Sequence, residues 1–337
     1  MSQRSSLKAL LKRFPPIRRW ANPVVSDRQL AEIEESICRV LDRPGAEQEL
    51  FTRLRARGVY LLREHYYRPL IDPAKLPQDY FSSTSPMVGI RIDPARCLEF
   101  AEKTLGEYIR ELRSFLPMDA EGNGEALHLN NGTYMAVDAH IYYALLRHLQ
   151  PSKIYEIGAG NSTLFAYEAL KRGGGLERSE LTVIEPYPDR IVKGGLSSVA
   201  RVRQAFVQDV EIEFFDSLGD GDILFIDSTH TLREGGDVQH LYCEVLPRLA
   251  SGVYVHVHDI SLPERYPRCY LDDGWFWNEQ YLLQAYLTHN DRAEVVWPGN
   301  YLMCKEPDRM LKLFPEIAAM RAVYPDSEPT AFWFRVR

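Results

Sequence analysis

The run KIYEIGAGNST, from Lys153 to Thr163, constrains the fold of this chain more than any other feature. A short apolar stretch leads into a Gly-x-Gly turn at Gly158 and Gly160, and a helix-like segment, 162–172, follows at once. In doubly wound α/β proteins this pattern lets a nucleotide-like ligand approach the backbone, because glycine has no Cβ atom. The run therefore predicts the first strand and helix of a Rossmann-like sheet.

The same turn indicates which ligand to expect. A dinucleotide-binding turn carries a third glycine, and that position holds Thr163 here. The carboxylate of Glu156 would repel a phosphate group but would suit a cationic amino-acid ligand. This combination favours S-adenosyl-L-methionine over a dinucleotide, although a Gly-x-Gly turn alone also occurs in purely structural strand–helix connections.

Further strand candidates downstream end in, or are followed by, polar residues. They are 181–185 with Glu185, 201–207 with Gln208 and Asp209 beyond it, 222–227 with Asp227, and 252–258 with Asp259 beyond it. Ligands bind at the carboxyl ends of the strands in an open parallel sheet, so this placement predicts a ligand site along one sheet edge.

Strands and helices alternate over the second part of the chain, which predicts an α/β fold with a doubly wound, mostly parallel sheet. The last strand candidate, 332–336, is expected to be antiparallel to its neighbours. We place the domain boundary near residue 130, between an N-terminal helical and loop region, 1–130, and an α/β domain, 131–337.

The N-terminal region contains helix candidates at 27–41, 50–63 and 94–115. Between the last two, the irregular segment 66–94 holds Tyr66, Tyr67 and Tyr80. Long irregular segments in enzymes often cover active sites. We therefore expect 60–94 to act as a lid over the carboxyl ends of the strands.

The bulk composition excludes several classes of protein. A net charge of −7 argues against a general affinity for nucleic acid. The five cysteines are scattered without CxxC spacing, which predicts reduced thiols and a cytoplasmic protein. Neither an apolar run of about 20 residues nor a signal-peptide pattern is present, so no transmembrane segment is expected. Assembly into a homo-oligomer stays open.

The first 22 residues are rich in Lys and Arg, without an acidic residue among them. Leu7, Leu10, Leu11 and Phe14 follow helical spacing. One interpretation is an amphipathic helix that makes a peripheral contact with an anionic membrane surface or a partner. The other, which the short apolar face favours, is a helix docked on the body of the protein.

Six motifs together resemble class I S-adenosylmethionine-dependent methyltransferases. More narrowly, they are similar to the small-molecule and sugar O-methyltransferases of polysaccharide and natural-product gene clusters. The resemblance covers roughly residues 130–337. The motifs are EIGAGNST (156–163), VIEPYP with Glu185, VQDV (207–210), DILFIDSTH (222–230), GVYVHVHDI (252–260) and WNEQYLLQAYL (277–287).

The resemblance implies S-adenosyl-L-methionine as cofactor, with roles for particular residues. Glu156, Gly158 and Gly160 would frame its methionine part, and Asn161 and Ser162 would donate hydrogen bonds at the helix N-terminus. The carboxylate of Glu185 would accept from both ribose hydroxyls. Asp209, with Gln208 beside it, would face the adenine amino group, unless Asp209 instead caps the segment 211–217.

A second group of residues resembles the divalent-metal site of sugar O-methyltransferases. Asp227, His258 and Asp259 would be the metal ligands, with His230, three residues after Asp227, as the catalytic base. In that family an acid stands where this chain has His258, so magnesium fits less well than manganese, iron or zinc. Without a metal, His230 or His258 would act as an unaided base, with Asp227 as its partner.

Alternatives remain for several of these residues. Glu279 either completes the site or is an ordinary first-turn helix residue, and His256 is expected in the core. Four aromatic residues between 266 and 277 form either a platform for a ring-shaped ligand or ordinary packing: Tyr266, Tyr270, Trp275 and Trp277.

The resulting function is S-adenosylmethionine-dependent methyl transfer to a hydroxyl of a small-molecule or glycan acceptor, such as a sugar or secondary metabolite. One alternative is a metal-dependent hydrolase or oxygenase that uses His258, Asp259, Asp227 and His230. Another is a non-catalytic scaffold. The acid at Glu185 discriminates, because a hydrolase has no need of a ribose-binding carboxylate.

Overall fold

The computed structural model describes residues 26–120, 127–188 and 196–337. The expectations for the basic segment 1–22 lie outside these residues. Contacts within the chain divide it into two compact units, Met1–Leu76 and Pro77–Arg337. Among the described residues, no helix is both long enough and apolar enough to cross a membrane.

The described part of the first unit contains three helices and the loops that connect them. The helices are α2 (Asp27–Leu41), α3 (Ala46–Arg55) and the 3-10 helix η2 (Pro73–Lys75). Ser26 and Gln29 form a capping box that fixes the start of α2. Neither α2 nor α3 buries a residue. The predicted helix 27–41 is therefore present, whereas the one expected at 50–63 begins and ends earlier.

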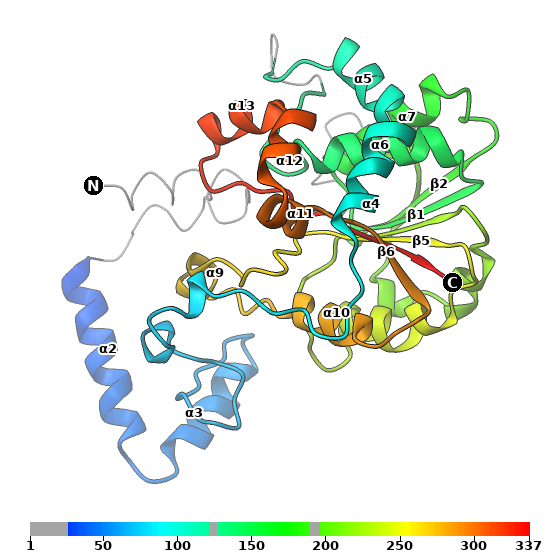
Figure 1. The fold of residues 1–337 in the computed structure, drawn as a ribbon. Helices are drawn as coiled ribbons and strands as arrows, with labels where there is room; N and C mark the ends of the chain where they lie inside the picture. The colour runs from blue at the N-terminus through cyan, green and yellow to red at the C-terminus, as the bar shows by residue number, and fades with distance from the viewer. Residues whose placement is uncertain (1–25, 121–126, 189–195) are drawn as a thin grey trace. The chain divides into compact units, whose positions relative to one another are not determined.

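The second unit contains a seven-stranded sheet in the order β3-β2-β1-β4-β5-β7-β6 (Figure 1). Strands β1 to β5 are parallel, and β7 runs antiparallel to both β5 and β6. This order confirms the predicted Rossmann-like sheet with an inserted antiparallel last strand. The strands are β1 (Lys153–Ile157), β2 (Glu180–Ile184), β3 (Arg201–Arg203), β4 (Ile223–Ile226), β5 (Tyr254–Val257), β6 (Ala293–Pro298) and β7 (Phe332–Val336).

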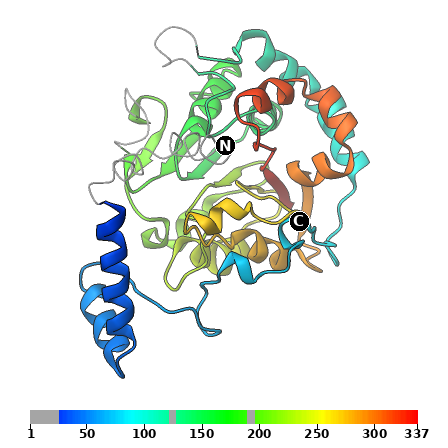
Figure 2. The same cartoon turned by 90° about the vertical axis from the view of Figure 1, so that its left-hand side faces the viewer.

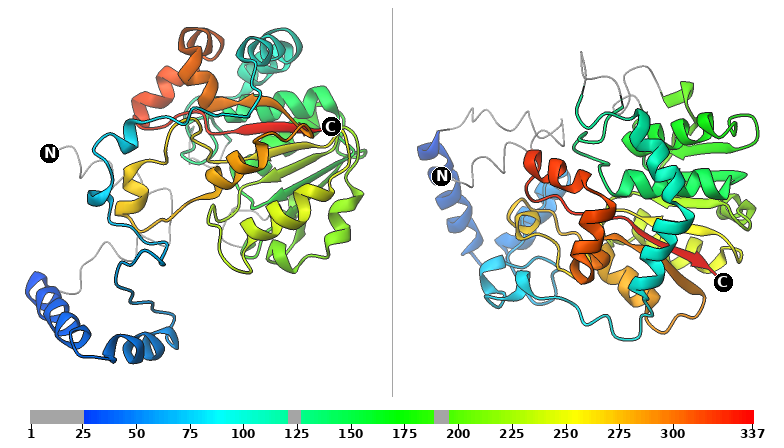
Figure 3. Two further views of the ribbon diagram at one scale, coloured as in Figure 1. Left: turned by 60° about the horizontal axis from the view of Figure 1, so that its bottom comes forward. Right: turned by 45° about the horizontal axis from the view of Figure 1, so that its top comes forward.

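Helices cover both faces of this sheet, because alternate strand residues enter two separate cores. In β4, Ile223 and Phe225 join one core, while Leu224 and Ile226 join the other. Figures 1 and 3 show α6 and α7 on one side of the sheet and α10 on the other, and Figure 2 gives a third view of these layers.

The first helix layer consists of α4 (Pro94–Glu99), the π-helix η4 (Phe100–Thr104), α5 (Gly106–Phe115), α6 (Asp138–Leu149), α7 (Asn161–Arg172), α11 (Gly299–Lys305), α12 (Pro307–Leu313) and α13 (Glu316–Val323). The second consists of η7 (Val207–Asp209), η8 (Ile212–Ser217), α8 (Asp237–His240), the π-helix η9 (Leu241–Val245), η10 (Leu246–Arg248) and α10 (Glu279–Leu287). Among the described residues of the second unit, three short helices lie outside these cores: η3 (Tyr80–Ser82), η6 (Leu196–Ser198) and α9 (Arg268–Asp272).

The contacts divide the chain earlier than the boundary expected near residue 130. Ile109 and Leu112 of α5 are buried in the same core as Tyr143 and Leu146 of α6. Burial of this apolar helix face ties the segment 94–115 to the sheet. The helices α4 and α5 thus belong to the α/β unit, and the division lies between Leu76 and Pro77.

Residues 77–94 of the expected lid lie in the second unit. Thr84 forms an isolated antiparallel bridge with Glu264, and the Ser85 N–H donates to the Pro263 carbonyl at 2.6 Å. Pro263 and Glu264 follow β5, so this part of the segment contacts a loop at the carboxyl edge of the sheet. Residues 60–76 belong to the other unit, and the role of 60–94 as a lid stays a prediction.

The glycine turn joins the ends of β1 and β4. Gly158 has a φ of +87°, and a Cβ atom on it would lie 2.2 Å from the Asp227 carbonyl oxygen. The Asp227 N–H donates to the Ile157 carbonyl at 2.9 Å, which fixes this close approach. A Cβ on Gly160, by contrast, would meet no atom within 4 Å. Gly158 is therefore required by the fold, and Gly160 is not.

This contrast predicts different effects for two equivalent substitutions. Gly158→Ala should lower the free energy of unfolding by about 2–4 kcal/mol, because it adds backbone strain and a clash with Asp227. Gly160→Ala is the matched control and should change it by less than about 1 kcal/mol. Urea unfolding of both variants measures the difference. Equal stabilities would contradict the packing described here.

Candidate active site

The carboxyl ends of β1, β2, β4 and β5 bring most of the predicted site residues to one sheet edge. Ile157, Ile226 and Val257 are consecutive partners across β1, β4 and β5. The residues that follow, Asp227 and His258, therefore leave the sheet side by side. The predicted convergence of polar residues at this edge is present in the structure.

Glu156 has a different environment from the one expected for a ligand contact. It is fully buried, the Tyr142 hydroxyl donates to its Oε1 at 2.8 Å, and the Thr163 hydroxyl donates to its Oε2 at 2.6 Å. Burial raises the pKa of this carboxyl group to about 7. Both oxygens are thus used inside the protein, where they tie α6 and α7 to β1. Glu156 shapes the turn and does not face a ligand.

Asn161 and Ser162 begin α7, directly after the turn. The Asn161 side-chain amide donates to the Thr133 hydroxyl at 2.8 Å, and Ser162 is buried. The backbone N–H of Gly160 donates to the Thr163 hydroxyl at 3.3 Å. The side chain of Asn161 therefore holds the segment around Thr133 against the helix N-terminus.

Glu185 and Gln208 occupy the ends of β2 and of the segment after β3. Glu185 is buried, and its Oε1 accepts from the Tyr187 N–H at 2.7 Å. Burial raises the pKa of its carboxyl group. The Oε1 atom of Gln208 is buried without a hydrogen-bond partner among the described residues. An unpaired buried amide oxygen is costly unless a ligand or water donates to it.

Asp209 lies beside Gln208 as the last residue of η7, and it is exposed. The alternative role as a helix cap is not observed, because Glu211 precedes η8 (Ile212–Ser217). Asp209 thus remains available at the edge where the resemblance places the adenine ring.

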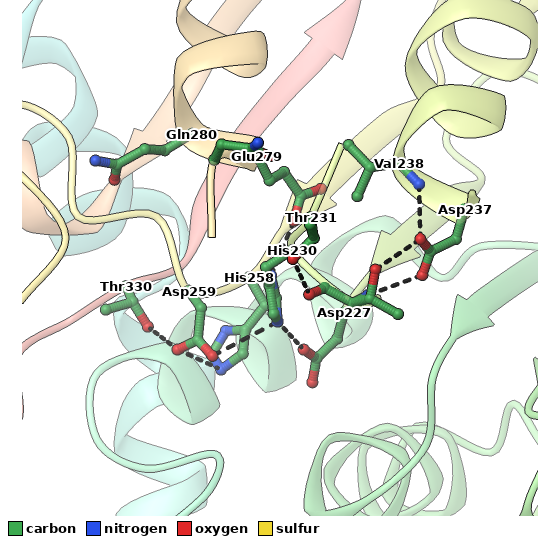
Figure 4. A network of polar contacts seen from close by, with 12 residues as sticks. Asp227, His230, Thr231, Asp237, Val238, His258, Asp259, Glu279, Gln280 and Thr330 are labelled. Carbon is green, nitrogen blue, oxygen red and sulfur yellow. Dashed lines mark hydrogen bonds and ion pairs between the residues drawn. The ribbon is translucent and has the colours of Figure 1, made fainter. Parts of the chain in front are cut away.

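Four charged residues form a compact group at the ends of β4 and β5, here called the charged centre: Asp227, His230, Asp259 and Glu279 (Figure 4). His230 lies in the middle of this group. Its Nε2 is 3.3 Å from Asp227 Oδ1 and 3.7 Å from Asp259 Oδ2, while its Nδ1 is 2.9 Å from Glu279 Oε2. His230 and Glu279 are both buried. The first-turn residue Glu279 is therefore part of the site.

The backbone at this centre is strained. His230 has a φ of +59° and Asp259 a φ of +53°, in the left-handed region that non-glycine residues seldom adopt. Such conformations cost about 1–3 kcal/mol each and cluster at functional sites. Both strained residues belong to the charged centre, where His230 Nε2 lies 3.7 Å from Asp259 Oδ2.

The carboxylates control the protonation of His230. Burial alone would lower its pKa, but hydrogen bonds to Asp227 and Glu279 and the charges of Glu279 and Asp259 raise it well above its ordinary value. Burial raises the pKa of Glu279, and the bond to His230 opposes this shift. The three carboxylates therefore favour the protonated form of the imidazole.

The potential metal ligands differ from the predicted set. One donor atom each from Asp227, His230 and Asp259 lie within 4.8 Å of one another. His258 is not in this group. Its Nε2 is 3.7 Å from Asp259 Oδ1, and its Nδ1 is buried without a hydrogen-bond partner among the described residues. In this group of potential ligands, His230 stands where His258 was expected, although His230 was expected to act as the base.

His256 lies deeper, in the core, as expected. It is fully buried and packs against Phe225, with ring centroids 4.1 Å apart. Burial lowers the pKa of its imidazole well below the ordinary value. His256 is therefore a neutral packing residue.

Sequence reasoning missed Asp138 and Thr330, which support the charged centre. Asp138 Oδ2 accepts from the Thr330 N–H at 3.0 Å, and the Thr330 hydroxyl lies 3.4 Å from Asp259 Oδ1. Asp138 is the only acidic residue of helix α6 and begins it, which was an available signal in the sequence. Nothing in the sequence pointed to Thr330, because it meets Asp259 only through the insertion of β7.

Residues 155–260 match a family model described as a methyltransferase domain. This range runs from β1 to just beyond β5 and contains the glycine turn and three residues of the charged centre. The match and the sheet order agree with the resemblance of this part of the chain to class I S-adenosylmethionine-dependent methyltransferases.

An uncharacterised protein of Archaeoglobus fulgidus is 32% identical over 135 residues, which cover 39% of this chain and 59% of that protein. The chain thus spans about three fifths of the length of this curated relative. The SAH-bound methyltransferase PaMTH1 of Podospora anserina is similar over 70% of this chain and 88% of its own, with 13% identity and a TM-score of 0.38. A SAM-dependent methyltransferase of Archaeoglobus fulgidus is similar over 59% of this chain and 93% of its own, with 16% identity and a TM-score of 0.28.

The buried Glu156 should make stability depend on pH. Its pKa is about 7 in the folded chain against an ordinary value of 4.5. Between these values the folded state binds more protons than the unfolded state, so the free energy of unfolding falls as pH rises and levels off above about 7. Glu156→Gln should remove up to roughly 3 kcal/mol of this decrease in the free energy of unfolding. Urea unfolding between pH 4.5 and 8 measures the change.

The exposed Glu177 provides the control for this experiment. Glu177→Gln should leave the curve of the unsubstituted protein unchanged. If Glu156→Gln also keeps the original slope between pH 4.5 and 7, Glu156 is not the buried acid described here.

Proposed function

We propose that this protein transfers a methyl group from S-adenosyl-L-methionine to a hydroxyl group of a small-molecule or glycan acceptor. The observation that carries the proposal is the position of two sets of residues on one sheet edge. Glu185, Gly160 and Gln208 follow β2, β1 and β3, and the charged centre follows β4 and β5. The residues that would bind the nucleoside thus lie beside the residues that would handle protons and charge.

The residues of the first half fit the cofactor. Gly160 leaves open space where a Cβ would otherwise point, so a ligand could approach the N-terminus of α7. The unpaired buried oxygen of Gln208 would accept a hydrogen bond from an amino group such as that of adenine. Glu185 would accept from ribose hydroxyls. When bound, the cofactor supplies a methyl group on a positively charged sulfur, which an acceptor oxygen can attack.

The charged centre also fits a divalent cation. Three carboxylates face a single imidazole, so the centre has an excess of negative charge that a cation would offset. Asp227, His230 and Asp259 would hold the ion, which would lower the pKa of an acceptor hydroxyl. A mixed set of one nitrogen and two oxygens suits manganese, iron or zinc better than magnesium.

The remaining residues of the centre act on its geometry and protons. Glu279 holds the Nδ1 side of His230, which leaves Nε2 directed at the two aspartates. Thr330 restricts Asp259. In the absence of a metal, His230 Nε2 is the group placed to take the proton of the acceptor hydroxyl once its own proton has left.

Cofactor binding is the first test. Titration calorimetry with S-adenosylhomocysteine should show binding to the full chain. Glu185→Ala should weaken it by roughly 1–3 kcal/mol through the loss of charge-assisted hydrogen bonds, whereas Glu177→Ala at an exposed site should not. An unsubstituted protein that binds neither S-adenosylhomocysteine nor S-adenosylmethionine would contradict the proposed function.

Metal binding is tested separately, with metal content as the readout. The proteins are incubated with manganese, iron or zinc salts and then desalted. The Asp259→Asn variant should retain at most about a tenth of the metal that the unsubstituted protein retains. His258→Ala should retain a similar amount, because His258 is not in the ligand group. Chelation should then abolish methyl transfer and leave S-adenosylhomocysteine affinity unchanged.

The opposite result has an equally definite meaning. If no metal is retained and chelators do not affect methyl transfer, His230 acts as an unaided base, and His230→Ala should slow transfer by about 10²–10⁴-fold. Retained transfer in both His230→Ala and Asp259→Ala would show that the charged centre is structural only.

A further inference from the structure

The loop between β5 and α10 begins and ends at the charged centre. β5 ends at Val257, Asp259 is the second residue after it, and the loop ends where α10 begins at Glu279. The N–H groups of Asn278 and Glu279 both donate to the His230 carbonyl, at 3.0 and 3.1 Å. The Leu232 N–H donates to the Asn278 side-chain oxygen at 2.6 Å. The end of the loop is thus fixed to the segment after β4, and whatever side chains it carries there are held next to the site.

Three aromatic residues of this loop form a surface that we call the aromatic wall: Tyr270, Trp275 and Trp277. Trp275 and Trp277 are stacked, with ring centroids 5.5 Å apart and an interplanar angle of 19°. Tyr270 contacts the edge of Trp277, at 4.7 Å and 68°. The Trp277 ring centroid is only 4.2 Å from that of His230. The wall is therefore continuous with the charged centre.

The wall is not part of the protein core. Trp297 and Trp333 are 1% and 0% exposed, whereas Trp275 and Trp277 are only partly buried. Packing of the loop is instead supplied by Tyr266, which is buried and whose hydroxyl accepts from the Gln280 N–H at 3.2 Å. Partly exposed aromatic rings beside polar groups are typical of ligand sites, since they contribute large apolar area at low cost in conformational entropy.

The charges around the wall limit the kind of ligand that fits. Asp272 and Asp273 are exposed just before Trp275, and Arg268 lies 3.4 Å from Asp272. With the carboxylates of the charged centre, acids outnumber cations here, which disfavours an anionic ligand. Several carboxylates can accept hydrogen bonds from a ligand that carries many hydroxyl groups. A simple phenol offers such groups at one position only.

We propose that the aromatic wall is the acceptor subsite and that it stacks against the apolar face of a neutral sugar ring. The inference rests on the proposed methyl transfer, because it supplies the acceptor for that reaction. The ring would lie against Trp275 and over the edge of Trp277, because Trp277 itself is stacked on Trp275 and contacts His230, with one hydroxyl directed toward the charged centre. Asp272 and Asp273 would bind other hydroxyls at the outer side of the ring.

The test is saturation-transfer NMR on the full chain in the presence of S-adenosylhomocysteine. The probes are the methyl glycosides of glucose, galactose, mannose and rhamnose, together with methyl glucuronide and catechol. We expect transfer to the ring C–H protons of at least one neutral glycoside, and weaker binding of glucuronide and catechol. Tighter binding of glucuronide or catechol, or no binding of any neutral glycoside by a protein that binds S-adenosylhomocysteine, overturns the inference.

Variants assign the binding to the wall. Trp275→Ala should weaken glycoside binding about tenfold while S-adenosylhomocysteine affinity, which also reports folding, stays unchanged. Trp275→Phe keeps a ring and should give an intermediate loss if the alanine variant is unstable. Tyr167 in α7 is also a partly buried aromatic residue, so Tyr167→Ala is the matched control. Unchanged glycoside affinity in both Trp275 variants overturns the inference, whereas absent S-adenosylhomocysteine binding by the unsubstituted protein refutes the proposed function itself.

Discussion

The close approach of two backbone segments, at Gly158 and Asp227, determines the geometry of this edge of the sheet. Only a glycine fits at this point of the turn after β1, because a Cβ atom on Gly158 would lie 2.2 Å from the carbonyl oxygen of Asp227. At this contact β1 and β4 end at paired residues, Ile157 and Ile226. As a result, the glycine turn and the charged centre leave the sheet next to each other, where a methyl donor and an acceptor would have to meet.

Buried carboxylates hold the surrounding elements in place in two different ways. Glu156 accepts hydrogen bonds from α6 and α7, and its raised pKa reflects a carboxyl group without a cation nearby. Glu279 instead bonds His230, which also faces Asp227 and Asp259. The first acid joins α6 and α7 to β1, and the second fixes the imidazole of His230. Both are fully buried, so burial alone does not separate these two arrangements.

The loop between β5 and α10 carries the residues that we propose to contact the acceptor. The sheet and the glycine turn are shared features of the fold, whereas acceptor choice requires contacts that differ between proteins with the same fold. Here the loop is fixed by backbone hydrogen bonds from Asn278 and Glu279 to His230. It presents partly exposed tryptophans to the same site. Rigid positioning of this kind reduces the entropic cost of binding a ring-shaped acceptor.

The sequence by itself determined the order of strands and helices, the antiparallel last strand and the positions of Glu185, Asp227 and Asp259 at strand ends. These features depend on local patterns, because apolar strands and the turns that end them are visible in a few consecutive residues. Only the tertiary structure decided that Glu156 faces inward and that His230, not His258, joins the two aspartates. It also brought Thr330 to Asp259. Side-chain direction after a strand depends on backbone angles, such as the positive φ of His230 and Asp259, and on contacts between distant segments, and neither is encoded in a local pattern.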